Sequence, residues 1–197
     1  FITIVLVLIF FWFWFLVNLF LADRCYQKAF FQARRHLYAD SLANYRKAAQ
    51  LCPFQYQYLY RYTLTLYHAA RYYQKRNQPE IATPYFNQAK TAALKLYKQN
   101  PGYYQLGYLL GQITESKARY HTASRYYRQA LALFPNNYQI QFRLAKTELL
   151  SGKISAALKA YQAGLRINPV SMAGLLQAEN LSAKDFTGSQ NLDSQRP

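Results

Sequence analysis

Three prolines recur at a constant interval in the second half of the chain. Pro101, Pro135 and Pro169 are separated by 34 residues each time. A fixed period of this length is typical of helical repeat arrays, in which stacked helix pairs bury together the apolar surface that one pair cannot bury alone. The spacing therefore predicts an all-α solenoid of helix–turn–helix units, which is an architecture for docking partners.

The residues before each proline match from repeat to repeat at the positions that a helix needs for packing. Before Pro135 and Pro169, a small residue lies twelve positions ahead, a tyrosine eight ahead and another small residue five ahead. Before Pro101 the same positions hold Ala89, Ala93 and Leu96, which match the pattern less closely. These residues share one helix face, and the small ones let a partner helix approach closely. The residues predicted to pack between helices are Tyr45, Ala48, Leu110, Gly111, Ala123, Tyr127, Ala130, Leu144, Ala145, Ala157 and Tyr161.

Pro53 fits the same register, but it stands 48 residues before Pro101, which exceeds the period by 14. The polar stretch 74–84 is the expected place of this excess, as a longer loop or as longer helices in the second repeat. The predicted solenoid covers 23–170, with repeats at 23–53, 54–101, 102–135 and 136–169. A capping helix is expected at 171–186 and a disordered tail at 187–197.

This pattern resembles the tetratricopeptide repeat (TPR) family, whose 34-residue unit has Leu-Gly or Leu-Ala in its first helix, Ala-x3-Tyr-x2-Ala in its second and a closing proline. The likeness runs from Asp23 to about Pro169, although the large aromatic residue expected early in the first helix is missing at Gly107 and Gln141. The resemblance implies a right-handed solenoid. The first helices of such a solenoid line a concave face that binds peptides or partner helices. We expect the contact set Tyr60, Arg61, Gln105, Gln112, Gln141 and Lys146.

Residues 54–62 fit two kinds of structure. Five aromatic residues alternate along this stretch, which is the pattern of a half-buried strand. The apolar residues of 56–67 also form a helical stripe, and the segment occupies the first-helix position of a repeat. We favour the helix, because a lone strand would have no partner.

Residues 1–22 contain no charged residue. As a helix they would extend roughly 33 Å, enough to cross a hydrocarbon core of about 30 Å. A signal peptide would need a basic leader and small residues before the cleavage site, and a buried helix of a soluble protein would rarely be apolar on every side. We therefore predict a transmembrane helix at 1–22.

Basic residues follow this segment directly. Arg24, Lys28, Arg34 and Arg35 stand against Asp23 alone, which favours a cytoplasmic location for the repeats, at a bacterial inner membrane. The same four residues are candidates for contact with anionic lipid headgroups.

The chain as a whole is strongly basic. Twenty-four Lys and Arg against eight Asp and Glu give a formal net charge of +16. Such a charge suits an anionic partner, but the basic residues are scattered with no run of five, so a solvated surface is the favoured interpretation. An RNA-binding helical array ranks last, because the membrane segment also argues against it.

No catalytic, cofactor or metal site is predicted. His36, His68 and His121 lie far apart, Cys25 and Cys52 have no metal-ligand spacing, and no phosphate-binding or nucleophile motif occurs. Two acidic residues, Glu115 and Glu148, occupy nearly equivalent repeat positions. We expect them on a shared solvent or groove face rather than as an acid and base pair.

The junction between the apolar segment and the first repeat carries a second resemblance. The stretches ADRCYQKA at 22–29 and ANYRKAA at 43–49, with Pro53, resemble the C-terminal region of O-antigen ligase-like and polymerase-like membrane proteins with appended TPR repeats. The resemblance implies an enzyme of surface polysaccharide assembly that uses a polyprenyl-linked glycan donor, with its active residues upstream. Because the chain begins with Phe, we expect it to be part of a longer polypeptide. The alternative is a stand-alone, single-span TPR adaptor in envelope assembly or secretion.

Overall fold

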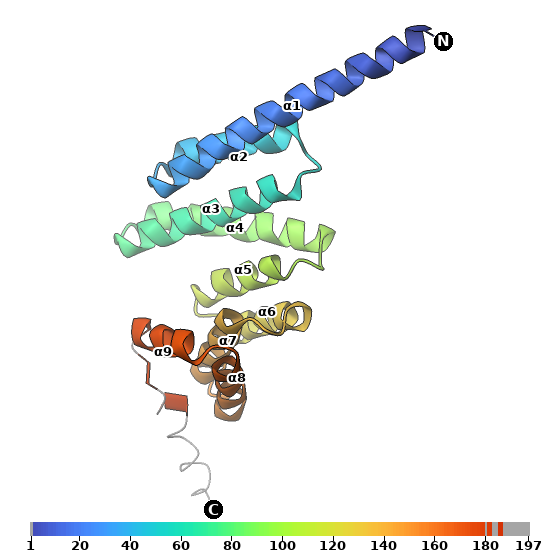
Figure 1. Ribbon diagram of the computed structural model, residues 1–197. Helices are drawn as coiled ribbons and strands as arrows, with labels where there is room; N and C mark the ends of the chain where they lie inside the picture. Colours follow the sequence, from blue (N-terminus) through green and yellow to red (C-terminus); the bar gives the residue numbers. More distant parts are fainter. Residues whose placement is uncertain (1, 180, 183–184, 187–197) are drawn as a thin grey trace, which may run out of the picture. The chain divides into compact units, whose positions relative to one another are not determined.

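The computed structural model describes residues 2–179, 181, 182, 185 and 186. Within these residues the chain forms nine α-helices and no strand (Figure 1). The expected all-α solenoid is therefore confirmed. The helices are α1 (Ile2–Arg34), α2 (Tyr38–Leu51), α3 (Tyr56–Lys75), α4 (Pro79–Gln99), α5 (Tyr104–Glu115), α6 (Tyr120–Leu133), α7 (Tyr138–Leu150), α8 (Ile154–Ile167) and α9 (Pro169–Ala178).

The chain divides into two compact units, residues 1–96 and 97–197. In the first unit α1 packs on α2 and α2 packs on α3, while Tyr67 of α3 contacts Phe86 of α4 edge to face, with ring centroids 6.1 Å apart. In the second unit each helix from α5 to α8 packs on the next. Each unit thus has its own core of helix pairs.

The small residues of the repeat lie where helices meet. All eleven residues predicted to pack between helices are buried. Gly111 of α5 shows why size matters, because a Cβ atom added there would lie 2.3 Å from the Tyr127 ring of α6. Two helices can approach this closely only where one of them lacks a side chain.

A turn of the same kind joins the two helices of every repeat. Two or three residues beyond the end of each first helix, one residue has a positive φ: His36 at 61°, Asn77 at 55°, Ala118 at 54° and Gly152 at 76°. This left-handed conformation closes the end of a helix and reverses the chain. Its recurrence at Ala118 and Gly152, one period apart, reflects the repeat in the backbone itself.

The extra length of the second repeat lies in its helices. α3 has 20 residues and α4 has 21, compared with 12 in α5 and 14 in α6. The turn between α3 and α4 remains short. Residues 56–62, for which a strand was the alternative, form the first turns of α3.

The helix α1 runs without a break from the apolar segment into the first repeat, over 33 residues. Its N-terminal half extends beyond the other helices of the first unit (Figure 1). Among the helices described, α1 is the one that is long and apolar enough to cross a membrane, judged by length and composition, and its apolar window is not buried. The residues of α1 that pack in the first unit include Ala22 and Ala29.

The second unit ends in a short cap. The Asn168 side chain accepts a hydrogen bond from the Ser171 backbone N–H and starts α9. Met172 of α9 lies against Gly164 of α8, and the Phe186 ring stacks on Tyr161 with centroids 4.8 Å apart. The helix predicted at 171–186 corresponds to α9 as far as Ala178, and of the described residues beyond Glu179, 181 and 182 are not helical whereas 185 and 186 are. The tail predicted at 187–197 lies outside the described residues.

Candidate functional site

A pocket of about 410 Å³ opens between the first helices of the first unit. Its walls come from the C-terminal end of α1, the beginning of α2 and nearly the whole of α3. We call it the basic pocket, and its lining residues are Phe30, Ala33, Arg34, His36, Tyr38, Tyr45, Arg61, Leu64, Thr65, His68, Arg71, Tyr72 and Lys75. Its volume falls within the roughly 300–1,000 Å³ of typical ligand sites.

The charge of the basic pocket has one sign. Arg34, Arg61, Arg71 and Lys75 line it, and no acidic residue does. Within the described part of the chain, none of these four side chains forms an ion pair. Cations gathered in a hollow and not neutralised by carboxylates create a positive potential that attracts anions.

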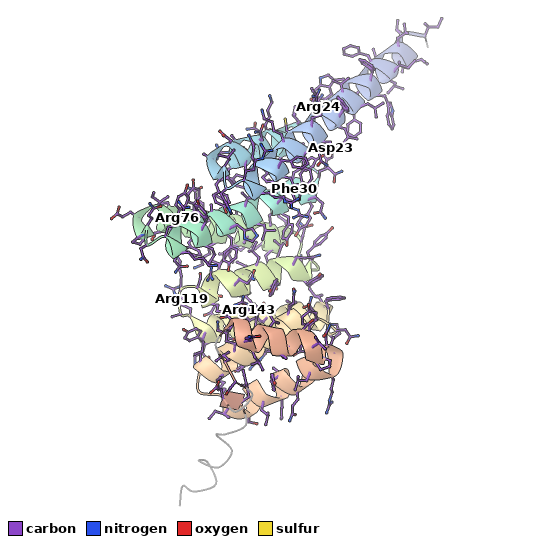
Figure 2. The ribbon with its side chains drawn as sticks, turned by 60° about the vertical axis from the view of Figure 1, so that its left-hand side comes forward. Asp23, Arg24, Phe30, Arg76, Arg119 and Arg143 are labelled. Carbon is purple, nitrogen blue, oxygen red and sulfur yellow. The ribbon has the colours of Figure 1, made fainter. Side chains whose placement is uncertain are left out.

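Arg61 occupies the inner part of this pocket. Its guanidinium carbon lies 5.9 Å from the centre of the Phe30 ring, which belongs to α1 (Figure 2), in a cation–π contact. The Nε atom of Arg61 is buried and has no hydrogen-bond partner among the described residues. A buried donor without a partner costs free energy, so an acceptor that entered the pocket would recover that cost.

Aromatic rings also line the basic pocket. The His36 ring stacks on Tyr72 with centroids 4.7 Å apart, and its Nδ1 atom lies 3.0 Å from the Tyr38 hydroxyl. The Arg76 guanidinium covers Tyr72 at 4.5 Å from the ring centre. The pocket therefore offers both cationic groups and flat apolar surfaces, a combination that binds carboxylate or phosphate groups together with apolar neighbours.

The surroundings of the pocket shift three pKa values. Burial, with a smaller effect of the Arg61 charge, lowers the pKa of His68 although part of its ring remains exposed. Burial and the neighbouring Tyr26 raise the pKa of Tyr45 to about 12, against the opposing effects of Arg61 and of a hydrogen bond with Thr65. Burial also raises the pKa of Tyr38. Burial therefore disfavours a charged His68, whereas three arginines and one lysine supply positive charge to the pocket.

The predicted contact residues of the first unit lie in different surroundings. Arg61 lines the basic pocket. Tyr60 does not line it, and its ring stacks on Tyr56 one helical turn earlier, with centroids 6.0 Å apart. The pocket also draws on residues that were not predicted as contacts, chiefly Arg71, Lys75 and His68.

In the second unit the predicted cation Lys146 is neutralised within the protein. Its ammonium group lies 2.5 Å from a Glu179 carboxylate oxygen and 3.4 Å from one of Glu115. Arg143 contacts the same two carboxylates at 3.2 and 3.1 Å, and the Tyr127 hydroxyl donates to Glu115 over 2.6 Å. Charges that satisfy one another in this way hold α5, α6 and α7 together and leave little free charge for a ligand.

The three glutamines predicted in this groove occupy partly buried positions. Gln112 lies one turn from Tyr108 and almost one turn from Glu115 on α5, on the same helix face. The Oε1 atom of Gln105 is buried and has no partner among the described residues. Gln141 packs towards α8, because its Cβ lies 3.4 Å from where a Cβ of Gly164 would be.

The expectation for Glu148 was wrong. Its side chain is not on a solvent or groove face but is buried at 1% exposure, where one carboxylate oxygen contacts Arg128 of α6 and the other has no partner among the described residues. The physical reason is that ion pairing between neighbouring helices can draw a carboxylate inward. Repeat register alone does not reveal such a pair.

The four basic residues proposed for lipid headgroups divide by their distance along α1. Arg24 lies directly beyond the apolar segment and covers the Phe20 ring at 5.9 Å. Lys28 is exposed about 9 Å beyond Ala22. Arg34 is the last residue of α1, roughly 18 Å beyond Ala22 along the helix, and Arg35 follows it in the turn. Arg34 lines the basic pocket.

The stacked helix pairs and the pocket between their first helices define a helical-repeat scaffold, a class of protein that binds partners on a surface formed by successive repeats. Residues 116–179 match the family model of the tetratricopeptide repeat, and the fold resembles TPR solenoids. The family model and the structural likeness both support the TPR family. No curated protein sequence matches the chain significantly.

Several solved structures share this fold at low sequence identity. MamA (41-end) from Desulfovibrio magneticus RS-1 is 14% identical over 76% of each chain, with a TM-score of 0.61. A second MamA structure is 14% identical over 88% of this chain and 87% of that one, with a TM-score of 0.55. PilF of Pseudomonas aeruginosa is 18% identical over 81% of this chain and 69% of that one, also with a TM-score of 0.55. These likenesses establish the fold.

Proposed function

We propose that this chain is a membrane-tethered docking module that holds an anionic segment of a partner protein in the basic pocket. The observation that carries the proposal is the pocket of about 410 Å³ that four cationic side chains line and no acidic one does. The buried, unpartnered Nε atom of Arg61 supplies a donor for an incoming acceptor. The segment would contribute carboxylates to these cations and apolar side chains to the rings of Phe30 and Tyr72.

The tether in this proposal is the N-terminal half of α1. Its support is an exposed apolar surface that includes both tryptophans of the chain, Trp12 at 63% and Trp14 at 55% exposure. Leaving so many large apolar side chains in water is unfavourable, and a bilayer would bury them. The unbroken helix from this segment into the first repeat would then fix the basic pocket at a set height above the membrane.

We place the repeats on the cytoplasmic side of a bacterial inner membrane. Arg24 and Lys28, both exposed directly beyond the apolar segment, support this orientation and suit contact with anionic headgroups. Labelling of Cys25, which is partly exposed, by a membrane-impermeant maleimide tests it. The thiol should react in inverted membrane vesicles and not in intact spheroplasts, and the reverse pattern would contradict the orientation.

The docking function is tested with the full chain in nanodiscs of phosphatidylcholine, so that no anionic lipid competes. The probe is a short fluorescent peptide rich in Glu and Phe, compared with the same peptide carrying Gln in place of Glu. We expect the acidic peptide alone to bind. Since a hydrogen bond to a charged group contributes roughly 1.5–3 kcal/mol, Arg61→Gln should weaken binding by about tenfold or more.

A matched control separates the pocket from the overall charge of the protein. Lys47→Gln with Lys95→Gln removes two exposed cations that do not line the pocket, whereas Arg61→Gln with Arg71→Gln removes two that do. Only the second pair should abolish binding. An equal loss of peptide affinity in both double variants would contradict the proposal. Displacement of the peptide by single-stranded RNA that carries the same total negative charge would also contradict it.

We propose further that this module serves surface polysaccharide assembly, as the C-terminal part of an O-antigen ligase-like or polymerase-like protein. Its support is the sequence resemblance at 22–29 and 43–49, together with the unbroken course of α1 through that junction. The alternative remains a single-span adaptor. The coding sequence upstream of Phe1 distinguishes them, because further spans favour the ligase-like protein and an initiator codon directly before Phe1 contradicts it.

A further inference from the structure

The turn between α2 and α3 places an aromatic ring against the apolar half of α1. Phe54 stacks on Phe15 with ring centroids 5.9 Å apart and an interplanar angle of 23°. Otherwise its side chain is open, at 68% exposure. Because Phe54 is exposed and stacks on the apolar half of α1, it extends the exposed apolar surface of that helix.

The turn is held in this place by buried groups. Cys52, at 1% exposure, packs with Ala22, Ala48 and Tyr58, and Leu19 of α1 packs against this cluster. The backbone N–H of Gln55 donates to the Cys52 carbonyl over 3.1 Å. The position of Phe54 beside α1 therefore follows from the core of the first unit.

The position of Phe15 along α1 indicates how deep the Phe54 ring would lie in a bilayer that α1 crosses. Phe15 precedes Asp23, the first charged residue, by eight residues, which is about 12 Å along the helix. A ring stacked on Phe15 is thus on the apolar side of the first charged residues. Side chains of interfacial proteins enter the boundary between headgroups and acyl chains by about 5–10 Å, a comparable depth.

The surface beside Phe54 suits such a boundary. Pro53 lines a shallow hollow of about 280 Å³ whose other walls are Ala49, Leu59, Gln50, Tyr62 and the stem of Arg46. The hollow is apolar, and the Arg46 guanidinium at its rim donates to the Tyr62 hydroxyl over 3.2 Å. Apolar surface with a cation at its rim is the arrangement expected where a protein meets lipid headgroups.

We propose that the α2–α3 turn is a second membrane contact, in which Phe54 inserts into the headgroup boundary of the bilayer that α1 crosses. This inference rests on the proposed tether. A helix alone could tilt and rotate in the bilayer, whereas a helix with a side anchor fixes the rotation of the first unit. The basic pocket would then face one direction relative to the membrane.

The test uses tryptophan as a depth probe, because the natural tryptophans Trp12 and Trp14 both lie in α1. The full chain is reconstituted in phosphatidylcholine vesicles whose acyl chains carry bromine near the headgroup or near the methyl end. Quenching of the natural protein reports insertion of α1. Phe54→Trp in a Trp12→Phe, Trp14→Phe background reports the turn. All three changes exchange one aromatic residue for another at largely exposed sites, so folding is preserved, which circular dichroism verifies.

Gln78→Trp in the same background is the matched control, because it lies at the other end of the 20-residue α3, about 30 Å away. We expect shallow bromines to reduce the emission of the Phe54→Trp variant by at least about twofold and to leave the control unchanged. Quenching of the natural tryptophans without quenching at position 54 would overturn this inference and leave the tether intact. Absence of quenching at all sites would overturn the tether and this inference together.

Discussion

The contact between Gly111 and Tyr127 offers the sharpest test of the packing between first and second helices. Gly111→Ala adds one methyl group whose carbon would lie 2.3, 2.5 and 2.8 Å from three atoms of the Tyr127 ring. Carbon atoms in contact lie about 3.5–4.0 Å apart, so the overlap is roughly 1 Å. The ring cannot yield easily, because it is fully buried and its hydroxyl is bound to Glu115 at 2.6 Å.

The expected cost follows from three opposing contributions. Overpacking of a tight core costs roughly 1–3 kcal/mol. Displacement of the ring also weakens a hydrogen bond to a charged group worth about 1.5–3 kcal/mol. Replacing glycine by alanine inside a helix returns about 1 kcal/mol. We therefore expect Gly111→Ala to lower the free energy of unfolding of the second unit by about 2–4 kcal/mol.

Hydrogen–deuterium exchange of the α5 and α6 amides, in the full chain in detergent micelles, measures this change locally. Gly107→Ala on the same helix is the matched control, because its Cβ would lie 3.3 Å from the Ala130 Cβ and needs only a small shift. The double variant Gly111→Ala with Tyr127→Leu should recover part of the loss. If Gly111→Ala is as stable as the natural protein, the close approach of α5 and α6 is refuted.

Three further predictions concern the backbone, a buried charge and a buried phenol. Ala118→Gly should stabilise the α5–α6 pair by about 0.5–1 kcal/mol, and Gly152→Ala should destabilise α7–α8 by about 1 kcal/mol, because both positions have a positive φ. The protection of the amide hydrogens of these helices against hydrogen–deuterium exchange tests both changes. Arg128→Ala should lower the free energy of unfolding in urea by about 2–4 kcal/mol, since it leaves the buried Glu148 carboxylate unpaired. Adding Glu148→Gln should restore part of this free energy. An Arg128→Ala variant that is as stable as the natural protein would contradict the pairing. Tyr45, whose pKa is raised to about 12, contributes stability that is complete below pH 10 and is lost as the pH rises through 12, by up to about 2 kcal/mol. Urea unfolding between pH 10 and 12 should show this decrease in the free energy of unfolding. The decrease should be smaller in Tyr45→Phe.

The sequence predicts the repeat architecture well because the packing of the repeats is periodic. A proline every 34 residues and a recurring tyrosine between small residues are sufficient to place α5 to α8 and the residues between them. A glycine marks the turn at Gly152 in the sequence itself. Its equivalent at Ala118 has no glycine to reveal the left-handed backbone, so the structure is needed to find it.

The candidate site was harder to predict, because it lies where the period fails. The repeat register predicts Arg61 as a groove residue. It does not predict Arg71 and Lys75, because they belong to the extra turns of α3. A signal was nevertheless present. Arg61, Leu64, His68, Arg71 and Lys75 share one face of a helix that continues to residue 75. The pairing of Lys146 with Glu179 had no such signal, because 33 residues separate them in the sequence.

The central claim is that the basic pocket, with Arg61 at its inner part, receives the anionic segment of a partner. The most direct measurement is the NMR signal of the Arg61 Nε–H group in the full chain in phosphatidylcholine nanodiscs, assigned with Arg61→Lys, as the peptide rich in Glu and Phe is added. We predict a large shift of this signal with slowed hydrogen exchange, because the buried Nε–H gains an acceptor, and no shift with the Gln peptide. A peptide that binds while the Arg61 signal stays unchanged would contradict the account.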